Sequence, residues 1–135
     1  MQEYYSILTN KGLELLAKAA TNQTQIVLSK IGVSDDESDI DQSEVSLKNE
    51  KHKFSINSLM VDEADANVLI AEGVINADIG GFYITKAAIY TTNNDIFAIA
   101  KLPKTYKPLL TQGSAKDLVI KFIMQVSNSS NITLK

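Results

Sequence analysis

The stretch from Phe82 to Leu102, FYITKAAIYTTNNDIFAIAKL, decides the fold class of this chain. Its two ends, Phe82 to Tyr90 and Ile96 to Leu102, are rich in β-branched and aromatic residues, which favour strands. The five residues between them, TTNND, contain asparagine and aspartate, which tolerate the backbone conformations of turns. The sequence therefore predicts a β-hairpin here.

Further strands are predicted on both sides of the hairpin, at 26–33, 54–61, 68–75 and 118–126. In 54–61, alternation places Phe54, Ile56 and Met60 on one face, and Gly73 marks a possible bulge near the end of 68–75. The segment 118–126 alternates most regularly. Its first face consists of Leu118, Ile120, Phe122, Met124 and Val126, and its second face is half apolar through Val119 and Ile123. A second face of this kind is expected to be covered as well.

One helix is predicted near the N-terminus, with Thr9 or Asn10 as its N-cap. Its expected apolar face consists of Leu13, Leu16, Ala17 and Ala20, widened by Leu15 and Ala19. The expected fold class is therefore α+β: mostly antiparallel β-structure with one N-terminal helix packed on the sheet. A chain of 135 residues with 44% hydrophobic content and no Pro/Gly-rich linker suits a single domain.

The composition excludes several classes of function. There is no cysteine, so there is no disulfide framework and no thiol nucleophile. There is no arginine either, and the formal net charge is −3, which argues against nucleic-acid binding. No window approaches the roughly 18 apolar residues of a membrane-spanning helix. The N-terminus MQEYYSILTNKG lacks the features of a secretory signal, so folding in the cytoplasm is expected.

The segment from Ser34 to Ser46, SDDESDIDQSEVS, carries six acidic residues and no basic one, which predicts a solvated surface loop. Its alternating acids resemble a calcium loop, but Ile40 stands where that loop requires glycine and Ser46 where it requires an acid. No metal site and no cofactor are therefore predicted. His52, the one histidine, lies among lysines and is expected to be exposed and inert, so no catalytic residue is predicted.

The connection PKTYKPLLTQGSAKD, residues 103–117, is longer than the roughly 12 residues beyond which structureless loops become uncommon in compact domains. Pro103 and Pro108 stiffen it, while Leu109 and Leu110 at its centre favour burial. A partner subunit is one way to cover them. Before the hairpin, Gly80 and Gly81 fit no phosphate-loop pattern and indicate a tight backbone feature, where a side chain would clash or a positive φ is needed.

Taken together, these motifs suggest a family. The ordered set is the glycine pair followed by Phe82, the hairpin, Tyr106-Lys107-Pro108, Gly113-Ser114 and the closing Ser127-Asn128. With the lead YSILTNKG before the helix, it resembles the N-terminal domain of tail fibre proteins from contractile-tailed phages and related prophages. One departure is Val33-Ser34-Asp35-Asp36, where such domains usually carry a glycine-rich turn.

The resemblance implies that residues 1–135 are a tail fibre N-terminal attachment domain, a non-enzymatic virion component made in the bacterial host cytoplasm. Such a domain would form a homotrimer and fasten the fibre to baseplate or other tail proteins for host adhesion, with shaft and tip outside this chain. Gly80, Gly81, Phe82 and Gly113 would shape the fold, and the partner-interface candidates are Tyr106, Lys107, Pro108, Leu109 and Leu110. The alternative is a calcium- or carbohydrate-dependent adhesion module that uses the acidic loop 35–44.

Overall fold

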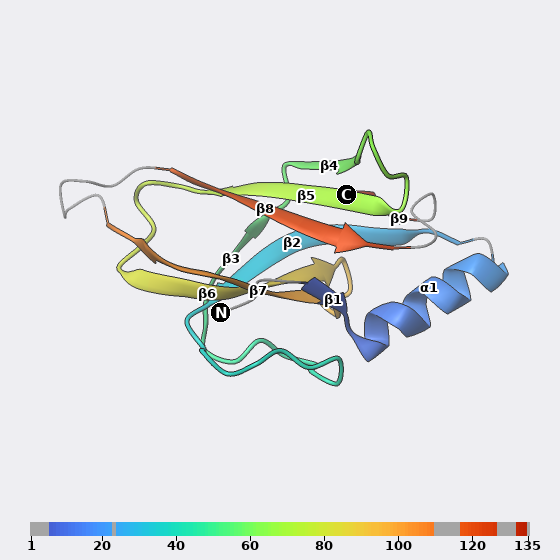
Figure 1. Ribbon diagram of the computed structural model, residues 1–135, viewed down its shortest axis with the longest axis horizontal. Coiled ribbons are helices and arrows are strands. Elements are labelled where there is room, and N and C mark those ends of the chain that lie inside the picture. Colours follow the sequence, from blue (N-terminus) through green and yellow to red (C-terminus); the bar gives the residue numbers. More distant parts are fainter. Residues whose placement is uncertain (1–5, 23, 110–116, 127–131, 135) are drawn as a thin grey trace.

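The computed structural model describes residues 6–22, 24–109, 117–126 and 132–134, which form two β-sheets packed face to face and one helix (Figure 1). Within these ranges there are ten elements. In chain order they are β1 (Ser6–Leu8), α1 (Asn10–Asn22), β2 (Ile26–Ser34), β3 (Glu50–Ser55), β4 (Ser58–Val61), β5 (Val68–Ile75), β6 (Phe82–Thr91), β7 (Ile96–Lys107), β8 (Leu118–Gln125) and β9 (Ile132–Leu134). The mostly antiparallel α+β class predicted from the sequence is confirmed.

The larger sheet has the strand order β1-β7-β6-β2-β3, with β9 paired in parallel to the first part of β2. The predicted hairpin is its centre, because β6 and β7 pair with each other along most of their lengths. Asn94 adopts a positive φ of 68° in the turn, as the turn chemistry of asparagine allows. The strand β7 continues beyond the predicted Leu102 to Lys107.

The smaller sheet has the order β4-β5-β8, and it corrects two sequence predictions. The segment 54–61 is not one strand: the backbone N–H of Ile56 donates to Ser29 in the larger sheet, and that of Asn57 donates to Glu72 in the smaller one. The chain crosses between the sheets at this point, and Met60 ends up exposed. At Gly73 the pairing is regular, without a bulge. A Cβ there would lie 2.8 Å from the ring of Phe54, so close packing explains this glycine.

The main core lies between the two sheets. On β8 the predicted alternation is confirmed, because Ile120, Phe122 and Met124 are buried whereas Val119 and Ile123 are 49% and 56% exposed. The larger sheet contributes its inner face to the same core, including Leu28, Ile31, Ile84, Ile89 and Phe97. Burial of these apolar side chains is the main force that holds the sheets together.

Thr9 is the N-cap of α1, since its Oγ1 accepts a hydrogen bond of 3.0 Å from the backbone N–H of Gly12. The predicted apolar face was partly wrong: Leu16 and Ala19 are buried as expected, together with Gly12, whereas Leu13, Ala17 and Ala20 are exposed. The helix is turned this way because Gly12 meets the β7 backbone, where a Cβ would lie 2.1 Å from the carbonyl oxygen of Phe97. The wider prediction, a helix packed on the sheet, stays a prediction.

The outer face of the larger sheet is covered by residues 35–49, here called the cover loop, which joins β2 to β3 below that sheet in Figure 1. Ile40 and Leu47 of the loop are buried against a second cluster that includes Ala88, Tyr90, Ile96 and Ile99. The prediction of a merely solvated loop was therefore incomplete. Two apolar anchors, Ile40 within the acidic segment and Leu47 just after it, fasten the loop to the sheet.

Candidate functional site

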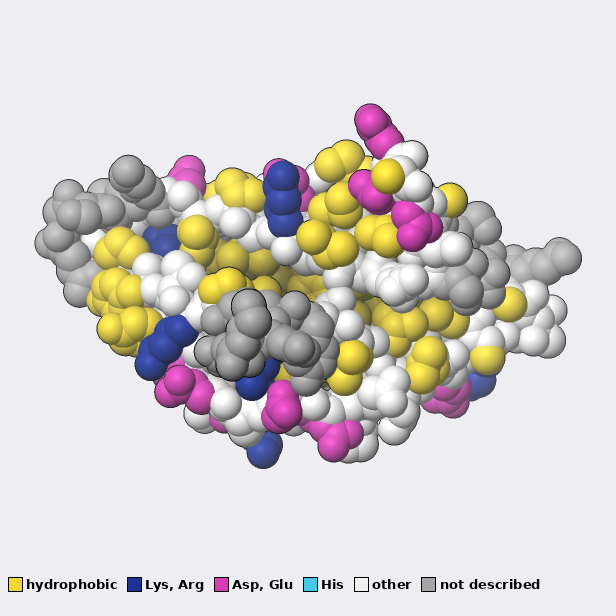
Figure 2. Space-filling view, in the orientation of Figure 1, with side chains coloured by type: hydrophobic (Ala, Val, Ile, Leu, Met, Phe, Trp, Pro, Cys, Tyr) yellow, Lys and Arg dark blue, Asp and Glu magenta, His cyan; other side chains and the backbone are white. Residues whose placement is uncertain are grey.

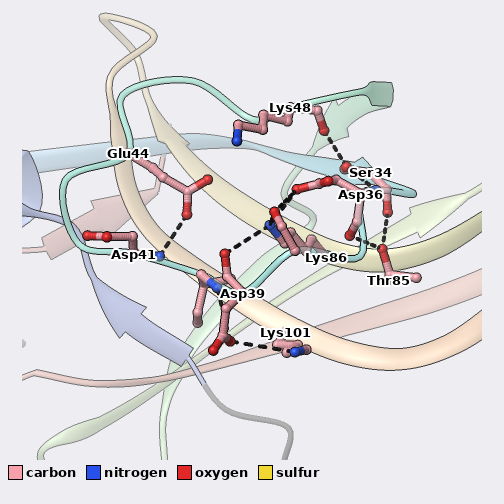
Figure 3. A network of polar contacts seen from close by, with 11 residues as sticks. Ser34, Asp36, Asp39, Asp41, Glu44, Lys48, Thr85, Lys86 and Lys101 are labelled. Atoms are coloured by element: carbon pink, nitrogen blue, oxygen red, sulfur yellow. Dashed lines mark hydrogen bonds and ion pairs between the residues drawn. The ribbon is translucent and has the colours of Figure 1, made fainter.

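A buried lysine stands at the centre of a polar network between the cover loop and β6 (Figure 3). Lys86 is 1% exposed, and its Nζ donates to Asp36 Oδ2 at 2.6 Å, to Ser38 Oγ at 3.1 Å and to the carbonyl oxygen of Asp39 at 3.3 Å. This set of acceptors offsets the cost of taking an ammonium group out of water. The hydrogen bond from Lys86 lowers the pKa of Asp36 to about 2.

The neighbouring side chains complete this network. Thr85 Oγ1 donates to the carbonyl oxygen of Asp36 at 2.5 Å, and Ser34 Oγ accepts from the backbone N–H of Asp36 at 3.0 Å. The Ser34 hydroxyl in turn donates to the carbonyl oxygen of Lys48, at the other end of the loop (Figure 3). Side chains thus hold the chain from the end of β2 at Ser34 to Asp36, within the stretch Val33–Asp36 where the family resemblance predicts a glycine-rich turn. We interpret the network as structural: it holds the cover loop against β2 and β6.

The remaining acids at the start of the cover loop face lysines from other elements. Lys51 lies 3.5 Å from Asp35, Lys104 lies 3.5 Å from Glu37, and Lys101 lies 3.5 Å from Asp39. These pairs are partly or largely exposed, so each contributes little stability. In the part of the chain that the structure describes, no three acidic or histidine side chains are grouped so as to hold a metal ion.

His52 is half-buried rather than exposed, which corrects the sequence prediction. Its ring stacks on Phe54, with the ring centroids 5.6 Å apart. Burial lowers the pKa of His52, because desolvation disfavours the charged imidazolium. Packing on the neighbouring aromatic ring accounts for the position of this histidine.

Two exposed tyrosines lie together where β6 begins and β7 ends. Tyr83 and Tyr106 are opposite each other in the strand register, with ring centroids 5.0 Å apart and an interplanar angle of 59°. They are 48% and 41% exposed, and Lys104 Nζ lies 4.8 Å from the centroid of the Tyr83 ring. We call these three residues the tyrosine patch. The patch presents parts of both tyrosine side chains and the Lys104 side chain to solvent.

The glycine pair shapes the backbone beside this patch. Gly81 has a φ of 87°, and its N–H donates to the carbonyl oxygen of Lys107 at 2.7 Å. A Cβ at Gly80 would lie 2.4 Å from the carbonyl oxygen of Pro108 and 2.6 Å from that of Lys107. A side chain at position 80 would therefore clash with the backbone of Lys107 and Pro108. At position 81, a residue other than glycine would be held in an unfavourable backbone conformation.

The interface residues predicted from the sequence differ in their exposure. Tyr106 is exposed at the end of β7, whereas Lys107 is buried and its Nζ donates to the carbonyl oxygens of Ile79 at 2.6 Å and Pro108 at 3.2 Å. Pro108 and Leu109 are half-buried. Leu110 and Gly113 lie outside the described residues. Within the described residues, the prediction of a partner contact therefore narrows to Tyr106, with Pro108 and Leu109 beside it.

Part of the predicted loop 103–117 is strand, because β7 runs to Lys107. Pro103 lies beyond the pairing with β1 that the described residues show, which extends from Ala98 to Ala100 of β7, and prolines in strands are confined to such edge positions. This strand was predicted to end at Leu102 because Pro103 follows it and because the connection to the next strand is long. Thr105 and Tyr106, residue types that favour strands, were the signal for the extension in the sequence.

The outer face of the smaller sheet is a second exposed surface. Register places six apolar residues on it: Met60, Val68, Ile70, Val74, Val119 and Ile123. We call these six residues the bare face. Figure 2 shows hydrophobic side chains along the side of the molecule where β4, β5 and β8 run. Sequence reasoning found the β8 part of this face but not the contributions of β4 and β5.

The described residues contain no helix that is both long and apolar enough to span a membrane. Comparison with known proteins then gives two matches. The sequence model of the family "Phage tail-collar fibre protein, N-terminal" matches residues 1–135. A probable tail fiber protein of Escherichia phage P2 is 25% identical over 136 residues, which is 98% of this chain and 20% of the relative. No solved structure matches the chain.

The chain thus spans about a fifth of the length of this curated relative. The family match extends over the fold described above, from β1 through the hairpin to β9. It identifies a structural component of the virion tail, as the sequence motifs predicted. The chain belongs to the phage tail-collar fibre protein family and corresponds to its N-terminal region.

Proposed function

We propose that this chain is the attachment domain of a tail fibre: it forms a homotrimer and fastens the fibre to proteins of the tail baseplate. The observation that carries the proposal is the family match over residues 1–135, combined with a relative about five times as long as the matched region. A domain of this size within such a long protein suits an anchoring role. The proposed domain comprises residues 1–135.

The proposed mechanism is recognition without chemistry, and the tyrosine patch is the contact we assign to the tail. Tyrosine combines a large apolar body with a hydroxyl group that can find a hydrogen-bond partner, and it is enriched among the residues that dominate binding energy. Tyr83 and Tyr106 are register partners at the end of the hairpin that lies opposite its turn. Because paired strands hold both residues, little conformational entropy is lost when a partner contacts them. Pro108, Leu109 and Leu110 would extend this contact.

The attachment is tested by Tyr106→Ala in the fibre protein, measured as the amount of fibre that co-sediments with purified tails. We expect incorporation to fall at least about tenfold, because truncation of a central tyrosine in an interface costs about 2 kcal/mol. The melting temperature of the isolated chain should change little, because Tyr106 is 41% exposed.

Val45→Ala is the matched control, since Val45 is an apolar side chain that is 81% exposed on the cover loop. It should leave incorporation unchanged. Normal incorporation of the Tyr106→Ala fibre would contradict the assignment of the tyrosine patch. The homotrimer is tested separately by light scattering of the 135-residue chain, where about three chain masses are expected and a monomer at micromolar concentration would contradict it.

A further inference from the structure

We propose that the bare face of the smaller sheet is the surface through which copies of this chain associate. The inference rests on the proposed homotrimer and adds the residues that form its contact. It assigns separate roles to two surfaces: the tyrosine patch meets the tail, and the bare face meets neighbouring copies.

The first argument is the chemistry of this face. Met60, Val119 and Ile123 are 51%, 49% and 56% exposed, and Val68, Ile70 and Val74 lie between them on the same side of the sheet. These side chains lie in two groups on the three strands, one on each side of the register pair Glu72 and Lys121, whereas exposed apolar residues on monomeric proteins are usually scattered. Burial against a similar surface would remove this area from water.

The second argument is charge complementarity within the face. Glu72 of β5 and Lys121 of β8 are register partners, and both project from the outer side of the sheet among the six apolar residues. Among the described residues, neither side chain makes an ion pair. The face therefore presents one acid and one base. In a cyclic assembly, Glu72 of each copy can meet Lys121 of the next, so the surface is complementary to itself.

The third argument is the position of the C-terminal end of the fold. The strand β9 pairs with the first part of β2 and contacts β4, at the border of the smaller sheet (Figure 1). The matched family is the N-terminal region of longer proteins, so the rest of a fibre would leave the domain on this side. The following segments of three chains can join in one fibre when their exits are close together. Association through the smaller sheet brings these exits near a common axis.

The test reverses the two charges in the 135-residue chain and follows mass by light scattering at fixed micromolar concentration. Glu72→Lys and Lys121→Glu should each weaken association by at least about tenfold, because like charges then meet in the interface. The double variant Glu72→Lys/Lys121→Glu should assemble again. Lys48→Glu, a charge reversal on the cover loop, is the control and should assemble like the wild type.

A mixing experiment separates contacts between copies from contacts within one chain. When mass-tagged wild-type chains are unfolded and refolded together with the double variant, native mass spectrometry should show two separate homotrimers, because mixed contacts place like charges together. Statistical mixing would overturn the inference. Ile123→Ser is a second, uncharged variant of the face, and it should shift the chain from trimer towards monomer.

The outcomes distinguish this inference from the proposed function. If all the variants remain trimeric, the bare face is not the contact between copies, although the homotrimer stands. If they remain trimeric but no longer co-sediment with tails, the face belongs to a tail protein and the inference is overturned. A wild-type chain that is monomeric overturns both the homotrimer and this inference, whereas attachment through the tyrosine patch is then still judged by co-sedimentation.

Discussion

The two sheets of this domain have outer faces of opposite character. The larger sheet is covered by residues 35–49 of the same chain, which bring Ile40 and Leu47 onto its apolar surface and Asp36 onto its buried lysine. The smaller sheet has an outer face of comparable apolar character, with Val119 and Ile123 about half exposed. Among the described residues, residues 35–49 cover the outer face of the larger sheet, and no comparable segment covers that of the smaller sheet.

Under the proposal that copies associate through the bare face, the two faces are buried in different processes: folding covers the larger sheet, and association covers the smaller one. The covered face has a buried charge with a defined partner, which fixes one position for the loop. The bare face has one acid and one base in register, with apolar side chains around them. Stability of the single chain should therefore depend on the covered face, and association on the bare face.

Asp36→Ala should have the largest effect on stability. The substitution leaves the Lys86 ammonium buried without its carboxylate, and loss of one partner of a buried ion pair costs about 3 kcal/mol. Urea unfolding at one fixed chain concentration measures this change. Asp35→Ala is the control, because its pair with Lys51 is partly exposed and should contribute less than about 1 kcal/mol. If both variants lost the same free energy of unfolding, the buried pair of Asp36 and Lys86 would not be what holds the cover loop in place.

Ile40→Ala should lower the free energy of unfolding by about 2 kcal/mol, because it removes a buried anchor of the cover loop. Val45→Ala, at an exposed position of the same loop, should change it by less than about 0.5 kcal/mol. Urea unfolding of both variants gives the comparison. If Ile40→Ala were as mild as Val45→Ala, the loop would not act as a cover.

The strands of this fold could be predicted largely from the sequence, because their alternation and their turns are local signals. The strands β5 and β8 were predicted close to their observed bounds, and so was the hairpin around TTNND except for the end of β7, which continues from the predicted Leu102 to Lys107. The crossing at Ile56 and Asn57 was not, because both halves of that segment have strand composition. The partners of these two residues, Ser29 and Glu72, are distant in sequence.

The features of the candidate surfaces depended more on tertiary context. Tyr106 was identified from its motif, but its neighbour Tyr83 is brought beside it by the β6–β7 register. Lys86 was missed because a lysine in a strand normally indicates a solvent-facing position. A lysine within the otherwise apolar run KAAIY, combined with a distant acidic segment, was the available signal for a buried pair.

Acid should lower the free energy of unfolding by weakening the ion pair between Asp36 and Lys86, which holds the cover loop on the larger sheet. The pKa of Asp36 is lowered from 3.8 to about 2 in the folded chain, so its ionised form stabilises the fold above about pH 4, and this contribution is lost as the pH falls towards 2. Asp36→Asn lacks this contribution at every pH. The stability difference between wild type and variant should therefore shrink from about pH 6 to about pH 2.5 in urea unfolding; a constant difference would contradict the assigned pair.

The smallest effect on the single chain is expected at the bare face. Ile123 is 56% exposed on the smaller sheet, so Ile123→Ser removes little buried area and should change the stability of the monomer by less than about 0.5 kcal/mol. Unfolding must be measured at a dilution where the wild type is monomeric, because association adds to apparent stability. At higher concentration the wild type alone should gain stability. A variant that gained as much as the wild type would show that the bare face stays uncovered in the assembly.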